Sequence, residues 1–190
     1  MPRPKSVSDE EIFAAALGLL ARHGLNGFTL TDTAKTVGLS RPAIIQRFGD
    51  RNGLLRRLAA YEVEATRAYV ESFDLAAGPQ GLWRFLSAMV RSMGTGEGFP
   101  VRVTMAALEA NDPDLRAKAF ARYAIVQSAI AARLPGRKDA DEIALFLHGV
   151  IAGASMQWVT YADGDLSAYV LKRLGFAFRL IFPDEDVDGG

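Results

Sequence analysis

The chain has 190 residues, 49% of them hydrophobic and 23% charged, which is the composition of a soluble globular protein with one large domain or two small ones. It contains no cysteine, so disulfides, thiolate metal sites and cysteine nucleophiles are excluded, and a reducing cytoplasm is the expected location. The net charge of the chain is zero, but the charge is unevenly distributed. Residues 1–57 carry nine basic and five acidic residues, a net charge of +4, and the remainder has a net charge of −4. This distribution indicates that only the N-terminal segment binds a polyanion.

Helical periodicity covers most of the chain and strand patterns are nearly absent, which predicts an all-α fold. Ser8 is expected to cap the first helix, because Glu11 follows three residues later and completes a capping box. Gly24 is expected to end this helix. Its buried stripe consists of Ile12, Ala16, Leu19 and Leu20.

Two short helices joined by a glycine turn are predicted next. The second helix begins at Thr29 or Thr31, and Gly38 takes the turn, where only glycine adopts a left-handed backbone without strain. Ser40 caps the third helix. Two helices joined by a turn of about 3–4 residues that contains glycine are typical of a DNA-binding helix-turn-helix.

The third helix has a polar outer face. Pro42 falls in its first turn, where a missing N–H is harmless, and Ile44 and Phe48 are expected to face the core. This arrangement leaves outside the side chains of Arg41, Ala43, Gln46 and Arg47.

A long connector helix is expected after the third helix. Gly49 ends the third helix, and Asp50 caps a fourth that runs to about Phe73. Residues 76–81, AAGPQG, are the clearest linker. Further helices are predicted at about 81–94, 100–110, 113–134, 138–162 and 166–182.

Residues 8–57 resemble the N-terminal segment of the TetR family of bacterial transcription regulators. The matching residues are Phe28-Thr29, Ala34, Val37-Gly38-Leu39-Ser40, Ala43-Ile44, Phe48-Gly49-Asp50-Arg51 and Leu54-Leu55. The resemblance implies a three-helix helix-turn-helix DNA-binding domain at 1–57. It also implies that the connector helix joins this head to a helical effector-binding and dimerisation body at 58–190.

Two positions depart from the family's pattern. Pro42 stands where a small residue or glycine is frequent, and Ile45 stands where a tyrosine that helps to hold a phosphate is common. Ile45 cannot donate such a hydrogen bond. Its apolar tip could instead touch a thymine methyl group or rest on the sugar backbone.

A recognition helix enters the major groove and reads base edges with a few side chains. In this role Gln46 is expected to pair with adenine, and Arg41 and Arg47 with guanine or phosphate. Thr29 and Arg51 are expected to hold phosphates. The complete set of expected DNA-binding residues is Thr29, Thr31, Ser40, Arg41, Ala43, Gln46, Arg47 and Arg51.

The body is expected to form a homodimer, because two heads on a pseudo-palindrome double the DNA contacts of one. Segments 142–159 and 168–182 are apolar on more than one face. The polar residues His148, Ser155 and Gln157 argue against a membrane span in the first segment. Residues expected at the dimer interface are Phe146, Gly149, Val150, Gly153, Tyr169 and Leu174.

The middle helices are rich in large apolar groups, which form either an ordinary core or the lining of a ligand cavity. The resemblance favours a cavity in this part of the chain. Residues expected to contact an effector are Trp83, Met89, Met93, Met105, Tyr123, Gln127, His148 and Trp158.

The resulting hypothesis is a ligand-responsive transcriptional repressor that a small apolar or amphipathic effector releases from a pseudo-palindromic operator. No catalytic residues, metal or cofactor are expected, because His23 and His148 are the only histidines and neither has further ligands at metal-binding spacing. The alternatives are an all-helical protein-interaction module and a small enzyme without DNA binding. DNA binding with a steep salt dependence separates the regulator from both.

Overall fold

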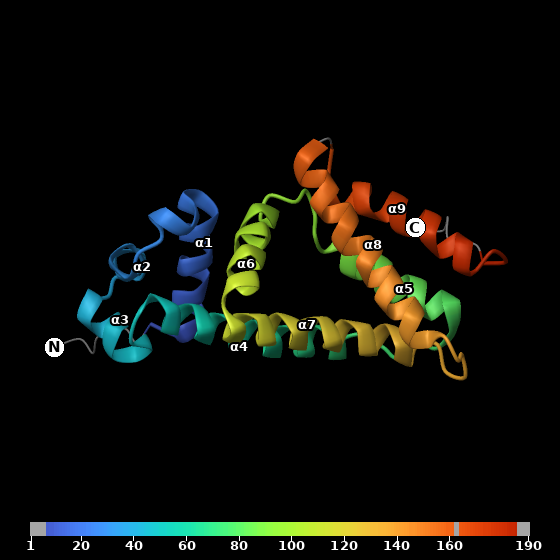
Figure 1. Ribbon diagram of the computed structural model, residues 1–190, viewed down its shortest axis with the longest axis horizontal. Helices are drawn as coiled ribbons and strands as arrows, with labels where there is room; N and C mark the ends of the chain where they lie inside the picture. Colours follow the sequence, from blue (N-terminus) through green and yellow to red (C-terminus); the bar gives the residue numbers. More distant parts are fainter. Residues whose placement is uncertain (1–6, 162–163, 186–190) are drawn as a thin grey trace. The chain divides into compact units, whose positions relative to one another are not determined.

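The computed structural model of the protein describes residues 7–161 and 164–185, apart from the side chains of Asn26 and Gly27. All regular elements in these residues are α-helices (Figure 1), as the periodicity predicts. In chain order they are α1 (Asp9–Gly27), α2 (Leu30–Val37), α3 (Arg41–Phe48), α4 (Arg51–Glu71), α5 (Gly78–Arg91), α6 (Phe99–Asn111), α7 (Pro113–Ala132), α8 (Ala140–Tyr161) and α9 (Leu166–Ile181).

The helices form two compact units. Unit 1 takes its described residues from Met1–Glu62 and Pro100–Ala119, and unit 2 takes its described residues from Val63–Phe99 and Phe120–Gly190. Helices α4 and α7 therefore contribute residues to both units. From the sequence, DNA binding is expected in residues 1–57, and effector binding and dimerisation in residues 58–190. This division by function stays a prediction.

The start of α1 is fixed by a reciprocal pair of hydrogen bonds. Ser8 Oγ accepts from the N–H of Glu11 at 3.2 Å, and Glu11 Oε2 accepts from the N–H of Ser8 at 2.8 Å. These bonds confirm the predicted capping box. Near the other end, Gly24 has a φ of 61° and kinks the helix at the residue that was expected to end it.

The predicted helix-turn-helix is present in α2 and α3. Thr29 Oγ1 accepts from the N–H of Asp32 at 3.1 Å, so α2 uses the earlier of its two possible starts. Gly38 ends α2 with a left-handed backbone, φ 72° and ψ 25°. Ser40 Oγ then accepts from the N–H of Ala43 at 3.3 Å and caps α3.

The step from α3 to α4 requires a glycine. Asp50 Oδ1 accepts from the N–H of Gly53 at 2.7 Å, which confirms Asp50 as the cap of α4. A Cβ atom on Gly53 would lie 2.0 Å from the carbonyl oxygen of Phe48. Only glycine therefore lets α4 begin this close to the end of α3.

Unit 1 has one apolar core, to which Met105 of α6 and Leu115 of α7 contribute alongside α1 to α4. An ion pair of 2.6 Å between Arg102 Nη1 and Glu62 Oε1 also joins α6 to α4. The other buried residues of this core are Ile12, Phe13, Ala16, Leu19, Leu20, Phe28, Leu30, Ala34, Ile44, Phe48, Leu54, Leu55, Leu58 and Ala59.

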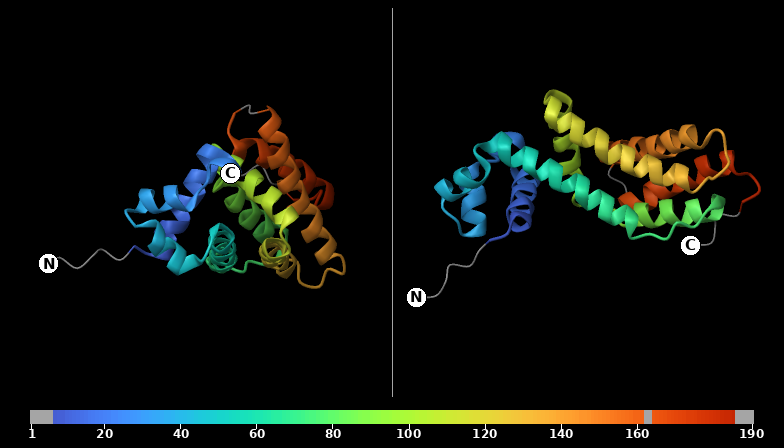
Figure 2. Two further views of the ribbon diagram at one scale, coloured as in Figure 1. Left: turned by 60° about the vertical axis from the view of Figure 1, so that its left-hand side comes forward. Right: turned by 90° about the horizontal axis from the view of Figure 1, so that it is seen from below.

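Unit 2 is built around α8 and α9, which lie side by side in Figure 1 and Figure 2, with α5 against α9. Helix α5 of this unit begins at Gly78. The prediction of a linker over residues 76–81 is therefore wrong for residues 78–81. Pro79 stands in the first turn of α5, where a helix needs no N–H donor. Residues 78–81 therefore belong to a helix.

A buried arginine in unit 2 was not foreseen from the sequence. Arg133 is 2% exposed, and its guanidinium donates to the carbonyl oxygens of Ala129 at 2.8 Å and Asp74 at 3.0 Å. The group also lies 3.9 Å from the centre of the Phe85 ring. Burial lowers the pKa of Arg133 from its usual value. Carbonyl groups at the end of α7 favour the positive charge.

Replacement of Gly53 by alanine is expected to destabilise the protein by about 1–3 kcal/mol, because the new Cβ forces Phe48 and α4 apart. The free energy of unfolding, measured by urea denaturation of the full chain, checks this. Gly18→Ala is the matched control: it places a Cβ inside α1 near only the flexible tip of Arg22, at 3.4 Å, and should stabilise the helix by about 1 kcal/mol. Equal stability of Gly53→Ala and wild type would contradict the prediction.

Candidate nucleic-acid interface

The recognition helix α3 has a buried inner face and an open outer face. Ile44 and Phe48 are 0% and 7% exposed, as the sequence predicts. Ala43 and Ile45 are half-buried. The exposed side chains at its start and along its outer face are Ser40, Arg41, Pro42, Gln46 and Arg47.

A concavity of about 450 Å³ lies between α2, α3 and the start of α4. Four of the eight predicted DNA-binding residues line it: Thr29, Thr31, Arg41 and Arg51. Ile45 also lines it, together with Phe28, Leu30, Gly49 and Asp50. The other four predicted residues, Ser40, Ala43, Gln46 and Arg47, are not among its lining residues.

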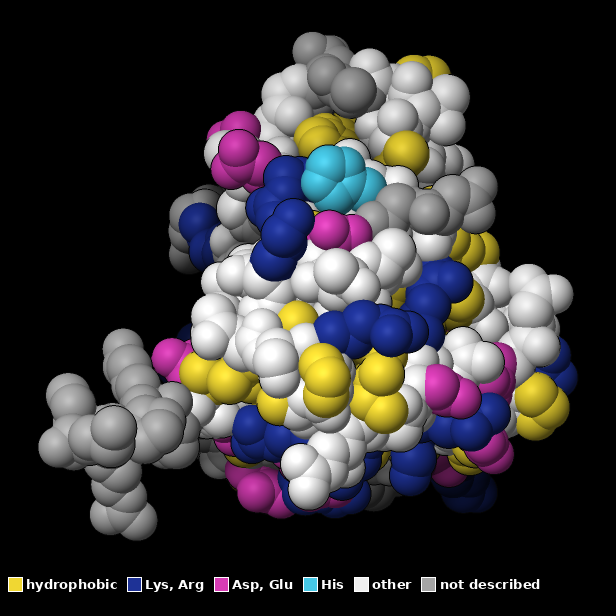
Figure 3. Space-filling view, turned by 90° about the vertical axis from the view of Figure 1, so that its left-hand side faces the viewer, with side chains coloured by type: hydrophobic (Ala, Val, Ile, Leu, Met, Phe, Trp, Pro, Cys, Tyr) yellow, Lys and Arg dark blue, Asp and Glu magenta, His cyan; other side chains and the backbone are white. Residues whose placement is uncertain are grey.

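The surface on this side of the molecule carries basic side chains next to apolar ones. Figure 3 views the side on which α2 and α3 lie and shows Lys and Arg side chains beside a group of exposed hydrophobic side chains. A mixed surface of this kind suits a duplex, because phosphates attract the basic groups and the base edges include the apolar thymine methyl group.

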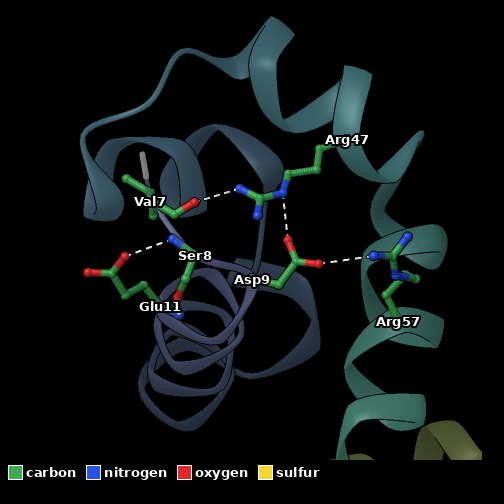
Figure 4. Close-up of polar contacts among 6 residues, drawn as sticks. All are labelled: Val7, Ser8, Asp9, Glu11, Arg47 and Arg57. Carbon is green, nitrogen blue, oxygen red and sulfur yellow. Dashed lines mark hydrogen bonds and ion pairs between the residues drawn. The ribbon is translucent and has the colours of Figure 1, made fainter. Parts of the chain in front are cut away.

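Arg47 is occupied by contacts within unit 1. Its Nη1 donates to the carbonyl oxygen of Val7 at 2.7 Å, and its Nε lies 2.5 Å from Asp9 Oδ1 (Figure 4). Arg57 Nη2 of α4 pairs with the other oxygen of Asp9 at 3.0 Å. One carboxylate therefore joins α3 and α4 to the start of α1, where the helix dipole also favours a negative charge.

This arrangement changes the expected role of Arg47. Its guanidinium already bonds the Val7 carbonyl and Asp9, so we expect Arg47 to act as a positioning residue rather than as a reader of guanine. Sequence reasoning assigned no role to Asp9. The sequence shows that Asp9 lies in the first turn of a helix. It does not show that Asp9 pairs with two arginines, because these lie 38 and 48 residues away.

Arg51 also forms a hydrogen bond to α1. Its Nη2 donates to the carbonyl oxygen of Leu25 at 2.5 Å, and its guanidinium lies 5.3 Å from the centre of the Phe28 ring. Half-buried at the edge of the concavity, Arg51 still places a positive charge beside Thr29 and Thr31.

Three of the predicted effector-binding residues meet between α7 and α8. The ring centroids of Tyr123 and His148 are 4.7 Å apart, and Gln127 Nε2 lies 3.3 Å from His148 Nδ1. Burial lowers the pKa of His148 and so favours its neutral form, which can share a hydrogen bond with the Gln127 amide through Nδ1. Tyr123 remains 49% exposed.

The tryptophans and the two nearby methionines pack elsewhere in unit 2. Trp83 lies against Phe178, with ring centroids 5.2 Å apart, and Trp158 Nε1 donates to the carbonyl oxygen of Gly164 at 3.0 Å. Met89 and Met93 are half-buried and pack against the core of unit 2.

Met105 must be removed from the expected effector site. It is 1% exposed and belongs to the core of unit 1, whereas the other seven predicted residues belong to unit 2. The sequence placed it among the middle helices, but α6 turns its apolar side chain toward α1 to α4.

The predicted dimer residues divide by exposure. Phe146, Gly149 and Gly153 are exposed on α8, whereas Val150 and Tyr169 are half-buried. Leu174 is fully buried within unit 2 and cannot supply a direct contact to a partner, which corrects that part of the expected interface.

Residues 12–58 match the sequence model of a family described as bacterial regulatory proteins, tetR family. This match covers α2, α3 and the turn between them, together with most of α1 and the start of α4. The helix-turn-helix segment of this chain is therefore similar to that of the TetR family. Its members are DNA-binding transcription factors, so this chain is a DNA-binding regulator and not an enzyme.

Individual relatives agree with this assignment. The HTH-type transcriptional repressor AcnR of Corynebacterium glutamicum is 29% identical over 136 residues, which are 72% of this chain and 69% of that protein. A transcriptional regulator from Rhodococcus sp. Rha1 has a similar fold, with a TM-score of 0.72, 18% identity and coverage of 90% of this chain and 95% of that one. A regulator from Saccharomonospora viridis, solved in complex with choline, has a TM-score of 0.71 at 21% identity and coverage of 88% and 93%.

Arg47→Ala is expected to weaken binding to all DNA sequences by a similar factor, roughly fivefold, because it loosens α3 from α1. Fluorescence anisotropy titrations with a panel of single-base-pair operator variants would measure this. Asp9→Asn should give the same pattern, and neither variant should change the salt dependence of binding.

Arg41→Ala is the matched control, since Arg41 is an exposed arginine on the same helix. Arg41→Ala should relax the preference at one base pair if Arg41 contacts a base. If Arg41 contacts a phosphate, the variant should reduce the slope of log affinity against log salt concentration by about one. If Arg47→Ala instead relaxed one base pair alone, Arg47 would be a base-reading residue.

Proposed function

We propose that this protein is a cytoplasmic homodimeric repressor of the TetR family that binds a pseudo-palindromic operator and is released by a small apolar or amphipathic effector. The observation that carries the proposal is the outer face of α3, which is exposed while its inner face is anchored by Ile44 and Phe48. An anchored helix with exposed polar side chains fits the major groove.

Specific binding requires contacts to both phosphates and bases. Thr31 and Arg51 at the concavity are suited to hold a phosphate, since they offer a hydroxyl group and a guanidinium. The Thr29 hydroxyl donates to Asp32 Oδ2 at 2.6 Å and would have to exchange that bond for one to a phosphate. Arg41 and Gln46 are free to address base edges from the exposed side of α3. One head reads few base pairs, so two heads on a pseudo-palindrome are required for a useful affinity.

The dimer interface that we propose is an apolar stripe on α8. Leu145, Phe146 and Met156 are 54%, 50% and 49% exposed, and the exposed Gly149 and Gly153 lie on the same side of the helix. No atom comes within 4 Å of a Cβ placed at either glycine, so a second helix could approach closely there. Large apolar side chains gathered on one helix face are typical of an interface.

A second copy explains this stripe better than a lipid bilayer does. By length and composition α8 could cross a membrane. Its opposite face, however, packs into the core of unit 2 through Ile143, Leu147 and Ile151. The neighbouring helix α9 adds Phe176 and Leu180, which are 62% and 67% exposed.

The effector site that we propose centres on Tyr123, Gln127 and His148. Two aromatic rings and one amide offer an apolar surface with polar groups that can fix the orientation of a ligand. The choline complex of the Saccharomonospora viridis relative supports small-molecule binding by this fold. A ligand that binds better to one arrangement of α7 and α8 shifts the population of that arrangement.

A duplex selected from a random library with the full chain is expected to contain two related half-sites and to bind one dimer. The logarithm of its affinity should fall linearly with the logarithm of salt concentration. Phe146→Asp should yield monomers in analytical ultracentrifugation and lower the operator affinity about tenfold or more, because the charge opposes burial of the α8 stripe.

Leu75→Asp is the control for a charge on an exposed apolar residue, since Leu75 is 68% exposed and lies outside α8 and α9. It should leave both the dimer and the affinity unchanged. A Phe146→Asp variant that remained dimeric, or that bound the operator as tightly as wild type, would reject the proposed interface.

An effector is expected to lower operator affinity about 5–150-fold, the usual range of allosteric coupling. Candidates are found by thermal-shift screening of small apolar and amphipathic compounds, beginning with choline, and are then titrated against the protein–DNA complex. His148→Ala should weaken the response to such a compound without weakening operator binding in its absence. Tighter operator binding in the presence of the compound would overturn release as the mechanism.

A further inference from the structure

One apolar side chain on the recognition helix is not used by the core alone. Ile45 follows the fully buried Ile44, yet it is only half-buried and lines the concavity beside Thr29, Thr31 and Arg41. Its carbonyl oxygen accepts from the N–H of Gly49 at 2.7 Å, which fixes the backbone at this point of α3. Ile45 therefore presents an apolar surface at a defined place on the DNA-facing side.

The other side chains of α3 indicate what this apolar surface could contact. Arg47 is engaged with Val7 and Asp9. Beside the small Ser40, Pro42 and Ala43, the larger side chains of α3 that remain available for readout are therefore Arg41, Gln46 and Ile45. The first two can form hydrogen bonds with purines. Ile45 can form none, and the apolar group that a base pair offers in the major groove is the 5-methyl group of thymine.

We infer that Ile45 reads the 5-methyl group of one thymine in each operator half-site, an inference that rests on the proposed function. Isoleucine suits this task because branching at Cβ leaves one strongly preferred rotamer in a helix, so little freedom is lost on contact. The contact removes apolar surface of both groups from water. Cytosine at the same position lacks the methyl group and leaves Ile45 against a polar edge.

The test replaces thymines of the selected duplex by deoxyuridine, one symmetric pair at a time, which deletes only the methyl groups. With the wild-type full chain, one pair is expected to lower the affinity about fifteenfold, because each of the two half-sites loses one buried methyl contact worth about fourfold, and the other pairs are expected to have little effect. Ile45→Ala should bind the thymine duplex more weakly and should no longer distinguish it from the deoxyuridine duplex.

Ile45→Val keeps the branch at Cβ and is the conservative variant; it should retain most of the discrimination. Thermal unfolding of each variant checks that it is folded, and the wild-type deoxyuridine series decides the question even if Ile45→Ala does not fold. The inference is overturned if no thymine pair is sensitive to loss of its methyl group. Equal sensitivity in wild type and Ile45→Ala would also overturn it and place Ile45 on the sugar backbone.

These outcomes are distinct from failure of the proposed function. If no duplex can be selected with the full chain, operator binding itself is rejected and the inference falls with it. If a duplex binds with a steep salt dependence but without methyl discrimination, the regulator stands and only the role of Ile45 is lost.

Discussion

Burial of Ile44 and Phe48 is the constraint on which the DNA-reading surface depends. The recognition helix has eight residues, a length at which an isolated helix is marginal in water. Its stability must therefore come from the packing of its inner face and from the caps at Ser40 and Gly49. Because the two anchors are four residues apart on one side, their burial also fixes the rotation of α3 about its axis. That rotation decides which side chains face outward.

Electrostatic contacts then reduce the number of side chains available to the bases. Asp9 pairs with Arg47 and Arg57 and thereby joins three helices of unit 1 at one carboxylate. Exposed ion pairs contribute little stability on average. Their consequence here is geometric, since a planar guanidinium that bonds both Asp9 and the Val7 carbonyl holds one orientation of α3. Under the proposed function, specificity falls to a small set of side chains in which the apolar Ile45 stands beside polar residues.

The two units divide the physical tasks of a regulator. Unit 1 combines its helix-turn-helix with residues of α6 and α7, so part of the later sequence is built into the DNA-binding half. Unit 2 keeps apolar side chains exposed on α8 and α9 while its core is closed around the opposite faces. Helix α4 contributes to both units; Gly53 in its first turn packs closely against the end of α3, and Arg57 in its second turn pairs with Asp9 of α1. This continuity is the physical basis for the coupling that we propose.

Local signals in the sequence were sufficient to predict the helices, the caps at Ser8, Ser40 and Asp50, and the left-handed turn at Gly38. Each of these features depends on residues within about four positions of one another. The same periodicity identified Ile44 and Phe48 as the buried face of α3. Contacts between distant residues could not be read in this way: neither the burial of Met105 in unit 1 nor the engagement of Arg47 with Asp9 leaves a local pattern. The sequence by itself determined which segments form helices and where the capped ones begin, whereas only the packing of distant helices decided which of their side chains remain free to bind, since that depends on partners far away along the chain.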